Sequence, residues 1–265
     1  MKAARALVVL AAAALAAGTV GAVSSADART QLGSLATATP VLPAAPASPT
    51  PTPTAPAGGR PPTFSEDFST PAAADGPFAA TYAGSWQPYP DGMSDKYWSG
   101  PLISAHDGYM DVAMDGKRGA AGTFGTPDDA WDHVGGTFSV RARAVGGDGN
   151  GAAFMLWPTS DDWSEGELDF PEGTFQGTVG AFTHSMVPGQ ERQAAGLHTD
   201  TTWRGWHTYT TEWVPGEVVR YSVDGEVVFE THEHVPTTAH RYMFQIGNWG
   251  QPGHLQIDRV RSWTP

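Results

Sequence analysis

The sequence contains no cysteine, so neither disulfide bonds nor thiolate chemistry contribute to this protein. Basic residues are also scarce, with 15 Lys and Arg against 28 Asp and Glu in 265 residues. Nucleic acids and anionic membrane surfaces are polyanions, so an acidic chain is a poor partner for either. No stretch shows convincing 3.6-residue periodicity, and there is no internal repeat. A disulfide scaffold, a thiol enzyme and a nucleic-acid-binding protein are therefore poor hypotheses.

Long apolar runs are missing as well, except at the start of the chain. MKAAR carries positive charge, ALVVLAAAALAAGTVGAV is apolar, and Ala26-Asp27-Ala28 supplies small residues for cleavage. This layout predicts a secretory signal peptide over residues 1–28 and a secreted protein, extracellular or associated with the cell wall. An uncleaved signal anchor stays open, because the run is about as long as the shortest membrane-spanning helix. We expect no membrane insertion of the mature domain.

Residues 29–62 lack the composition of a folded core. The part from 36 to 62 holds nine of the 22 prolines and no aromatic residue, which favours extended polyproline II over a packed structure. We interpret 29–62 as a linker and 63–265 as the folded domain, which contains all ten tryptophans. About 200 residues can bury a sufficient core without cross-links. A monomer is expected.

The folded part has the pattern of an all-β protein. TFSVRARA alternates apolar and polar residues, and GAAFMLWP is a short apolar run bounded by Gly and Pro. Asp224-Gly225 lies between two β-rich runs, which predicts a hairpin. Together these patterns predict a β-jelly-roll sandwich of two curved antiparallel sheets. The expected strands cover residues 137–144, 151–158, 178–187, 206–214, 217–223, 226–232, 242–249 and 254–263.

The segment GELDFPEG at 166–173 places three carboxylates in six positions: Glu167, Asp169 and Glu172. On a regular strand, Glu167 and Asp169 share a face and Glu172 lies on the opposite one. A β-bulge adds one residue and changes the face of everything after it. Pro171 has no N–H for a ladder, so it indicates a bulge near Phe170-Pro171. All three acids then share one face, and Phe170 points toward the core.

Three clustered carboxylates are costly, because like charges disfavour one another's ionised form. No basic residue between Arg143 and Arg192 is available locally to neutralise them. The cluster suits a reaction that needs one acid ionised and another protonated at the same pH. Glycoside hydrolysis has this requirement. Two alternatives stay open: an acidic strand on a solvated face, and a sandwich that binds glycans without cleaving them.

The motif also carries a resemblance. Glu-x-Asp-x-x-Glu in GELDFPEG resembles the signature of family 16 glycoside hydrolases, of the secreted bacterial type, in its bulged form. The resemblance covers most of 63–265 and implies a concanavalin A-like jelly roll with a glycan cleft on its concave sheet. Pro171 replaces the family's more usual aliphatic residue. The tryptophan that is common two positions after the family's Ala-Phe appears at Trp157 instead. These two departures leave the substrate preference open. The other matching stretches are SEDF, GGTFSVRARA with GAAFMLWP, WHTYTTEWVPGEVVRYSVDG and LQIDRVRSW.

By this resemblance Glu167 is the nucleophile, Asp169 its assistant and Glu172 the general acid/base of a retaining endo-glycosidase. A β-linked polysaccharide is the implied substrate, with β-1,3-glucan the best single choice and a β-galactan or mixed-linkage β-glucan as alternatives. No cofactor is required for this chemistry. The family often holds a structural calcium, and Asp258 matches a position that can bind it.

Several other side chains are candidates for contacts with the sugar. Aromatic rings stack on the apolar faces of sugars, and Trp163 precedes the acidic motif by four residues. Trp157 and Trp249 are further candidates, each with a core role as the alternative. His184 follows on the next strand, where the family often has a histidine near the cleft. His232 and His234 lack both helical spacing and a third ligand, so a zinc site is a poor hypothesis.

Overall fold

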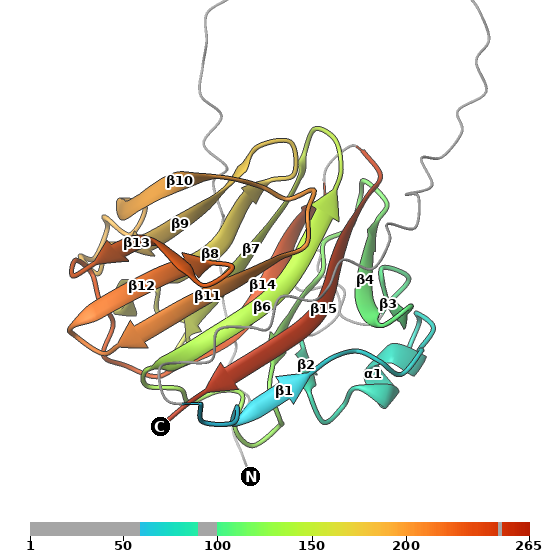
Figure 1. The fold of residues 1–265 in the computed structure, drawn as a ribbon, viewed down its shortest axis with the longest axis horizontal. Coiled ribbons are helices and arrows are strands. Elements are labelled where there is room, and N and C mark those ends of the chain that lie inside the picture. Colours follow the sequence, from blue (N-terminus) through green and yellow to red (C-terminus); the bar gives the residue numbers. More distant parts are fainter. Residues whose placement is uncertain (1–58, 90–99, 249–250) are drawn as a thin grey trace, which may run out of the picture. The chain divides into compact units, whose positions relative to one another are not determined.

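The computed structural model describes residues 59–89, 100–248 and 251–265, and all structural statements concern these. They form two antiparallel β-sheets that pack face to face (Figure 1). The prediction of an all-β sandwich is thereby confirmed. Within the described residues, no helix is long and apolar enough to cross a membrane.

The sheet at the front of Figure 1 has the order β13-β12-β11-β6-β15-β4-β3, with β1 paired to β15. Its longest neighbours, β6 and β15, pair antiparallel along most of their lengths. We call it sheet A. Its strands are β1 (Phe64–Glu66), β3 (Ile103–His106), β4 (Tyr109–Met114), β6 (Gly136–Val145), β11 (His207–Val214), β12 (Val218–Val223), β13 (Glu226–Thr231) and β15 (Gly253–Trp263).

The second sheet, sheet B, has seven strands in the order β10-β9-β8-β7-β14-β5-β2. It lies behind sheet A in Figure 1. A short helix α1 (Pro77–Thr81) precedes it, and a single 3-10 turn η2 (Trp163–Glu165) leads into β8. Its strands are β2 (Trp86–Pro88), β5 (Ala121–Phe124), β7 (Asn150–Pro158), β8 (Leu168–Thr174), β9 (Thr178–His184), β10 (Ala194–Thr202) and β14 (His240–Asn248).

Strand β7 shows how the sequence separates the two faces of sheet B. Ala152, Phe154 and Leu156 belong to the main core between the sheets. Met155 and Trp157, one position out of phase, belong to a separate apolar cluster. Successive side chains of a strand point to opposite faces, so this second cluster lies on the outer face of sheet B. Strand β7 is one apolar run in the sequence, but its alternate side chains belong to the main core and to the outer face of sheet B.

Local turn chemistry is confirmed where the sequence signals were strongest. Asp224 and Gly225 both have positive φ, at 50° and 91°, and join β12 to β13. Their turn type needs this backbone geometry, which Asp and Gly tolerate. The sequence patterns did not reveal α1, the strands β2 to β5 or β10. Strand β10 is an edge strand whose residues are mostly exposed, so it lacks the apolar alternation that identifies a half-buried strand.

Candidate active site

Strand β8 contains the expected bulge. Asp169 pairs with Met155 of β7, and Glu172 pairs with Ala153. Phe170 and Pro171 thus stand opposite a single β7 residue, which is the definition of a bulge. The pairing with β9 shows the same shift, since Asp169 and Glu172 enclose two residues while their partners enclose one. The extra residue lies where Pro171 indicated it.

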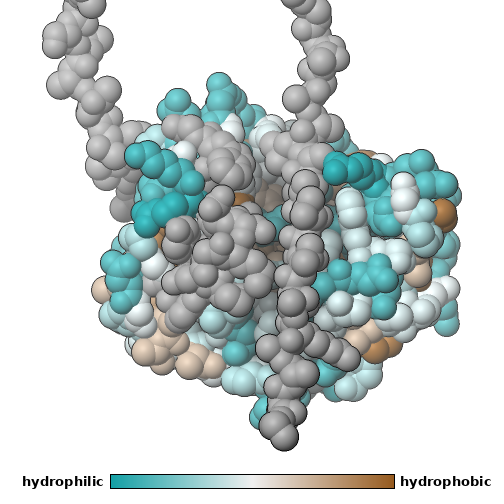
Figure 2. Space-filling view, turned by 180° about the vertical axis from the view of Figure 1, so that it is seen from behind, coloured by the Kyte–Doolittle hydropathy of each residue, from teal (hydrophilic) through white to brown (hydrophobic). Residues whose placement is uncertain are grey.

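The bulge places the acids on the outer face of sheet B. Phe170 is buried in the main core, where its ring lies 5.5 Å from that of Tyr209 and 5.3 Å from that of Tyr221. Asp169 therefore points away from the core, and the pairing of Glu172 with Ala153, a member of the outer cluster, puts Glu172 on the same side. Figure 2 views the molecule from this side and shows strongly hydrophilic residues bordering the face. Glu167, Asp169 and Glu172 are the trio referred to below.

Two of the three acids are deeply buried. Glu167 is 8% exposed and Asp169 1%, while Glu172 is half-buried. Burial raises the pKa of Glu167 well above its ordinary value, and the nearby Asp169 charge raises it further. Burial and the charge of Glu172 do the same for the pKa of Asp169. Burial also raises the pKa of Glu172, whereas the neighbouring His184 and His198 lower it. Burial in this site therefore makes all three carboxyls harder to ionise than the same groups in water.

His184 fixes where one of these protons lies. Its Nδ1 is 2.8 Å from the carbonyl oxygen of Glu191, which can only accept, so Nδ1 carries a hydrogen. Its Nε2 is 3.0 Å from Asp169 Oδ2. One proton must occupy this second contact, either on an imidazolium or on the Asp169 carboxyl. In both cases the pair holds less negative charge than an isolated aspartate, which reduces the repulsion that Glu167 experiences.

The same three groups form the cluster of potential metal ligands that the described residues contain. One oxygen of Glu167, one of Asp169 and a ring nitrogen of His184 lie within 4.8 Å of one another. Both ring nitrogens of His184 already have partners, since Nδ1 bonds to the Glu191 carbonyl and Nε2 faces Asp169 Oδ2. Asp169 Oδ1 remains buried without a hydrogen-bond partner among the described residues.

The candidate sugar-binding residues have different environments. Trp163 is half-buried beside the trio, with its ring 5.8 Å from that of His184 and 6.4 Å from that of Trp157. This suits a stacking platform. Trp157 is on the same face but only 4% exposed, so it supports Trp163 from below and offers a sugar little surface. His184 contacts Asp169, as described. Trp249 lies outside the described residues.

A buried arginine that the sequence reasoning missed holds these tryptophans in place. Arg241 on β14 pairs directly with Trp157 on β7. Its Nη2 lies 2.6 Å from Asp161 Oδ1 and 2.9 Å from the hydroxyl of Tyr89. The indole Nε1 of Trp157 donates to the same Asp161 oxygen at 3.0 Å, and the Arg241 guanidinium lies over the ring of Trp131 at 5.3 Å. Arg241 and Met243 are two residues apart on one strand, so strand alternation places them on the same face of the sheet. This alternation was the sequence signal from which the position of Arg241 could have been predicted.

The structure gives no support to the expected calcium ligand. The carboxylate of Asp258 accepts from the Arg141 guanidinium on the neighbouring strand β6. This carboxylate is thus already paired with a positive charge, and Asp258 belongs to no cluster of three or more potential ligands among the described residues. Calcium at this position stays an expectation from the resemblance alone. His232 bonds to the carbonyl of Glu217 and faces Glu230, so His232 and His234 likewise join no such cluster in the described part of the chain.

Comparison with protein families shows to which family the chain belongs. Residues 94–255 match the family model described as glycosyl hydrolases family 16. The match spans more than half of the chain and includes the whole trio. The chain belongs to glycosyl hydrolase family 16. This family 16 protein is therefore a glycoside hydrolase, and its substrate is a polysaccharide. No curated protein sequence matches it.

Solved structures share the fold of this family 16 protein at low sequence identity. A laminarinase from Rhodothermus marinus has 19% identity and a TM-score of 0.59, over 77% of this chain and 96% of the other. A β-glucanase from Bacillus licheniformis has 17% identity and a TM-score of 0.57, over 76% and 98%. Endo-acting O-glycanases of the human gut microbiota give 13% identity and a TM-score of 0.59, over 77% and 99%. At these identities the likeness shows the jelly-roll fold.

Because the folded state raises the pKa of Glu167, removing that carboxyl is expected to stabilise the protein. The native state binds a proton that the unfolded state releases, so stability is lost as pH rises from the ordinary glutamate pKa through the raised native pKa. Glu167→Gln should raise Tm at pH 8 by about 2–4 °C, corresponding to about 1 kcal/mol in a domain of this size. Calorimetry at pH 4 to 8 checks this.

A matched control is Glu226→Gln, the same change at an exposed residue at the start of β13. It should leave Tm unchanged at every pH. The gain from Glu167→Gln should shrink toward acid pH, where both states are protonated. A gain that is equal at pH 4 and pH 8 would contradict the assigned cause.

Proposed function

We propose that this protein is a secreted, retaining endo-glycosidase that hydrolyses β-1,3-glucan by double displacement. One observation carries the proposal: the bulge at Phe170-Pro171 brings Glu172 onto the face of Glu167 and Asp169. A binding module needs no such trio, whereas double displacement needs a nucleophile, an acid/base and control of their charges. The glucan would lie across the outer face of sheet B.

In this proposal Glu167 attacks the anomeric carbon and forms a covalent glycosyl-enzyme. Glu172 protonates the departing oxygen and then, as a carboxylate, takes a proton from the water that releases the sugar. Burial raises the pKa of Glu172, which favours the protonated form that the first step needs. Asp169 and His184 share a proton beside Glu167 and so regulate the charge around the nucleophile. The reaction requires no cofactor.

The choice of β-1,3-glucan rests on the laminarinase among the similar structures and on the aromatic platform beside the trio. Trp163 offers an apolar ring beside the acids. It packs against the outer cluster that contains Trp157, and Tyr89, which bonds to Arg241, packs against the same cluster. The similar structures also include proteins that act on other glycans. A mixed-linkage β-glucan or a β-galactan is therefore the alternative substrate.

The proposal extends to the parts of the chain outside the described structure. Residues 1–28 would direct the protein out of the cell and be removed, and residues 29–62 would separate the catalytic domain, 63–265, from whatever holds its N-terminal end. The mature enzyme would act as a monomer, extracellularly or at the cell wall.

Substrate identity is tested by incubating the purified protein with laminarin, lichenan, xyloglucan, agarose and carrageenan. We expect reducing sugar from laminarin, released as a ladder of oligosaccharides because cleavage is internal. NMR of the first products should show the β-anomer, as retention requires. Release from lichenan or agarose alone would reassign the substrate. No release from any polymer, with saturable binding to one of them, would favour a glycan-binding module.

A further inference from the structure

Phe182 is an aromatic side chain that lies on the face of the trio and packs into neither apolar cluster. It stands on β9 directly opposite Asp169 of β8, and residues that face each other across an antiparallel pair point to the same side. Its side chain is half-buried and belongs neither to the main core nor to the outer cluster that contains Trp157. Core packing therefore does not account for this ring.

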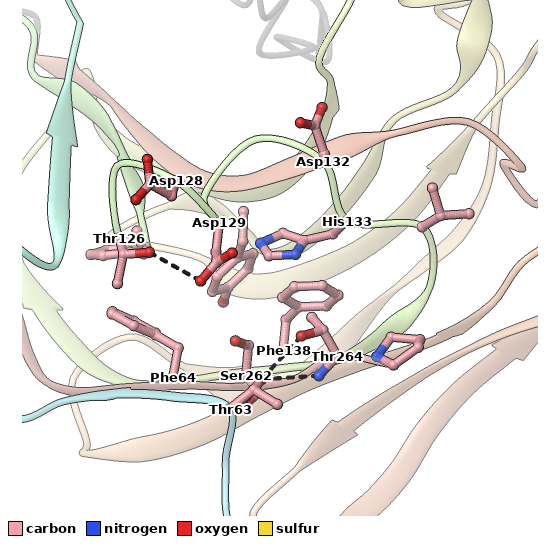
Figure 3. Close-up of a pocket in the computed structure, with 15 residues that line it drawn as sticks. Thr63, Phe64, Thr126, Asp128, Asp129, Asp132, His133, Phe138, Ser262 and Thr264 are labelled. Carbon is pink, nitrogen blue, oxygen red and sulfur yellow. Dashed lines mark hydrogen bonds between the residues drawn. The ribbon is translucent and has the colours of Figure 1, made fainter.

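Phe138 shows the surroundings of a core ring in this domain. It is 0% exposed, and its ring lies 5.1 Å from that of His133 and 5.4 Å from that of Tyr242. Figure 3 shows Phe138 beneath the loop that joins β5 to β6, close to His133. Phe182 differs, because its one ring contact among the described residues is with His198, at 5.4 Å.

Two glycines allow the Phe182 ring to lie flat against sheet B. Gly180 precedes it by two residues on β9, and Gly196 is its partner on β10. A methyl group added at Gly180 would lie 2.7 Å from ring atom Cζ, and one added at Gly196 would collide with Cδ1. Carbon atoms pack at about 3.5–4.0 Å, so the ring fills the space above both glycines. One face of the ring is thus covered by backbone, and the half-burial fits a second face that points outward.

The covered ring lies next to Glu172. Gly180 pairs with Glu172 of β8 on one side and with His198 of β10 on the other. The ring above Gly180 therefore lies in the row that joins these two side chains. His198 meets Phe182 at an interplanar angle of 76°, an edge-to-face contact that holds the orientation of the ring.

Trp163 lies at the other end of the trio. Its ring is 5.8 Å from that of His184. The backbone N–H of His184 donates to the carbonyl oxygen of Glu167 at 2.9 Å, so His184 stands beside Glu167. One aromatic ring therefore lies close to each of the two glutamates.

We propose that Phe182 is the platform for the leaving-group sugar, which stacks its apolar face on the outward face of this ring. The inference rests on the proposed function, because it needs Glu172 as the acid/base. A general acid protonates the departing oxygen, so the departing sugar lies against Glu172. Aromatic rings bind the apolar faces of sugars. Trp163 then serves the sugar that becomes bonded to Glu167.

The test compares laminarin, whose leaving group is a sugar, with β-laminaribiosyl fluoride, whose fluoride leaving group does not reach Phe182. Phe182→Leu should lower kcat/KM for laminarin about three- to tenfold, which is the contribution of one aromatic stack. The loss on the fluoride should be less than about twofold. Gly180→Ala keeps the ring but tilts it off the sheet, so it should give the same pattern. The double variant should lose no more than Phe182→Leu alone, because Gly180 acts through the ring.

Phe229→Leu is the matched control, because it makes the same change at another half-buried ring, on β13 of sheet A. It should leave the ratio of the two kcat/KM values unchanged, and thermal melts establish that each variant is folded. A wild type inactive on both substrates would overturn the proposed function and this inference with it. With an active wild type, equal losses on both substrates in Phe182→Leu, no loss on laminarin, or additive losses in the double variant would each overturn the platform alone.

Discussion

Glu167→Gln is expected to reduce glucan hydrolysis by about four to six orders of magnitude, because the amide cannot form the glycosyl-enzyme. Glu172→Gln should cost about two to four orders of magnitude, since a general acid/base contributes less than a nucleophile. Asp169→Asn should reduce the rate less, because Asp169 acts on the reaction indirectly, by changing the pKa of Glu167. Initial rates on laminarin measure all three. Melting curves show whether each variant keeps the fold, and wild-type-like turnover in Glu167→Gln or Glu172→Gln would refute the catalytic assignment.

Chemical rescue separates the roles of the two glutamates. With an aryl β-glycoside substrate, azide can enter the space left in Glu167→Ala and attack directly, which gives an α-glycosyl azide after one inversion. In Glu172→Ala the glycosyl-enzyme still forms, and azide releases it as a β-glycosyl azide after two inversions. We expect these two different anomers. The same anomer from both variants, or reversed anomers, would contradict the assignment of nucleophile and acid/base.

Arg241→Met is expected to destabilise the domain by about 3–5 kcal/mol, because it leaves the Asp161 carboxylate buried without its counter-charge. Side-chain exposure is 3% for Arg241 and 10% for Asp161. The hydrogen bonds to Tyr89 and to the carbonyl of Pro158 are lost as well. Urea unfolding measures the effect. Since Trp157 shares Asp161 with Arg241, KM for laminarin should also rise, with a smaller change in kcat.

The matched control is Arg220→Met on sheet A. Arg220 also contacts two carboxylates, Glu212 at 2.8 Å and Glu230 at 2.5 Å, but its side chain is 35% exposed. We expect a loss of stability several-fold smaller than that of Arg241→Met, and an unchanged KM. Adding Asp161→Asn to Arg241→Met should recover part of the lost stability, because it removes the unpaired charge. Similar losses from Arg220→Met and Arg241→Met would show that burial of the Arg241–Asp161 pair is not the cause.

The sequence alone determined the fold class, the hairpin at Asp224-Gly225 and the bulge in β8. These follow from local rules, because strand side chains alternate with a period of two and Pro171 cannot donate to a ladder. The mismatch of Glu172 with that period, together with Pro171, was sufficient to align the three acids. Strands β2 to β5 and β10 were missed, and β10 was missed because an exposed edge strand does not need apolar alternation.

Only the tertiary structure decided what surrounds the acids. His184 meets Asp169 through the pairing of β8 with β9, and Arg241 meets Trp157 because β14 pairs with β7 across more than 80 residues of sequence. The Asp258 carboxylate forms an ion pair with Arg141 because the strands β15 and β6 are neighbours in sheet A. Registers between strands distant in sequence are set by packing of the common core, which no local pattern encodes.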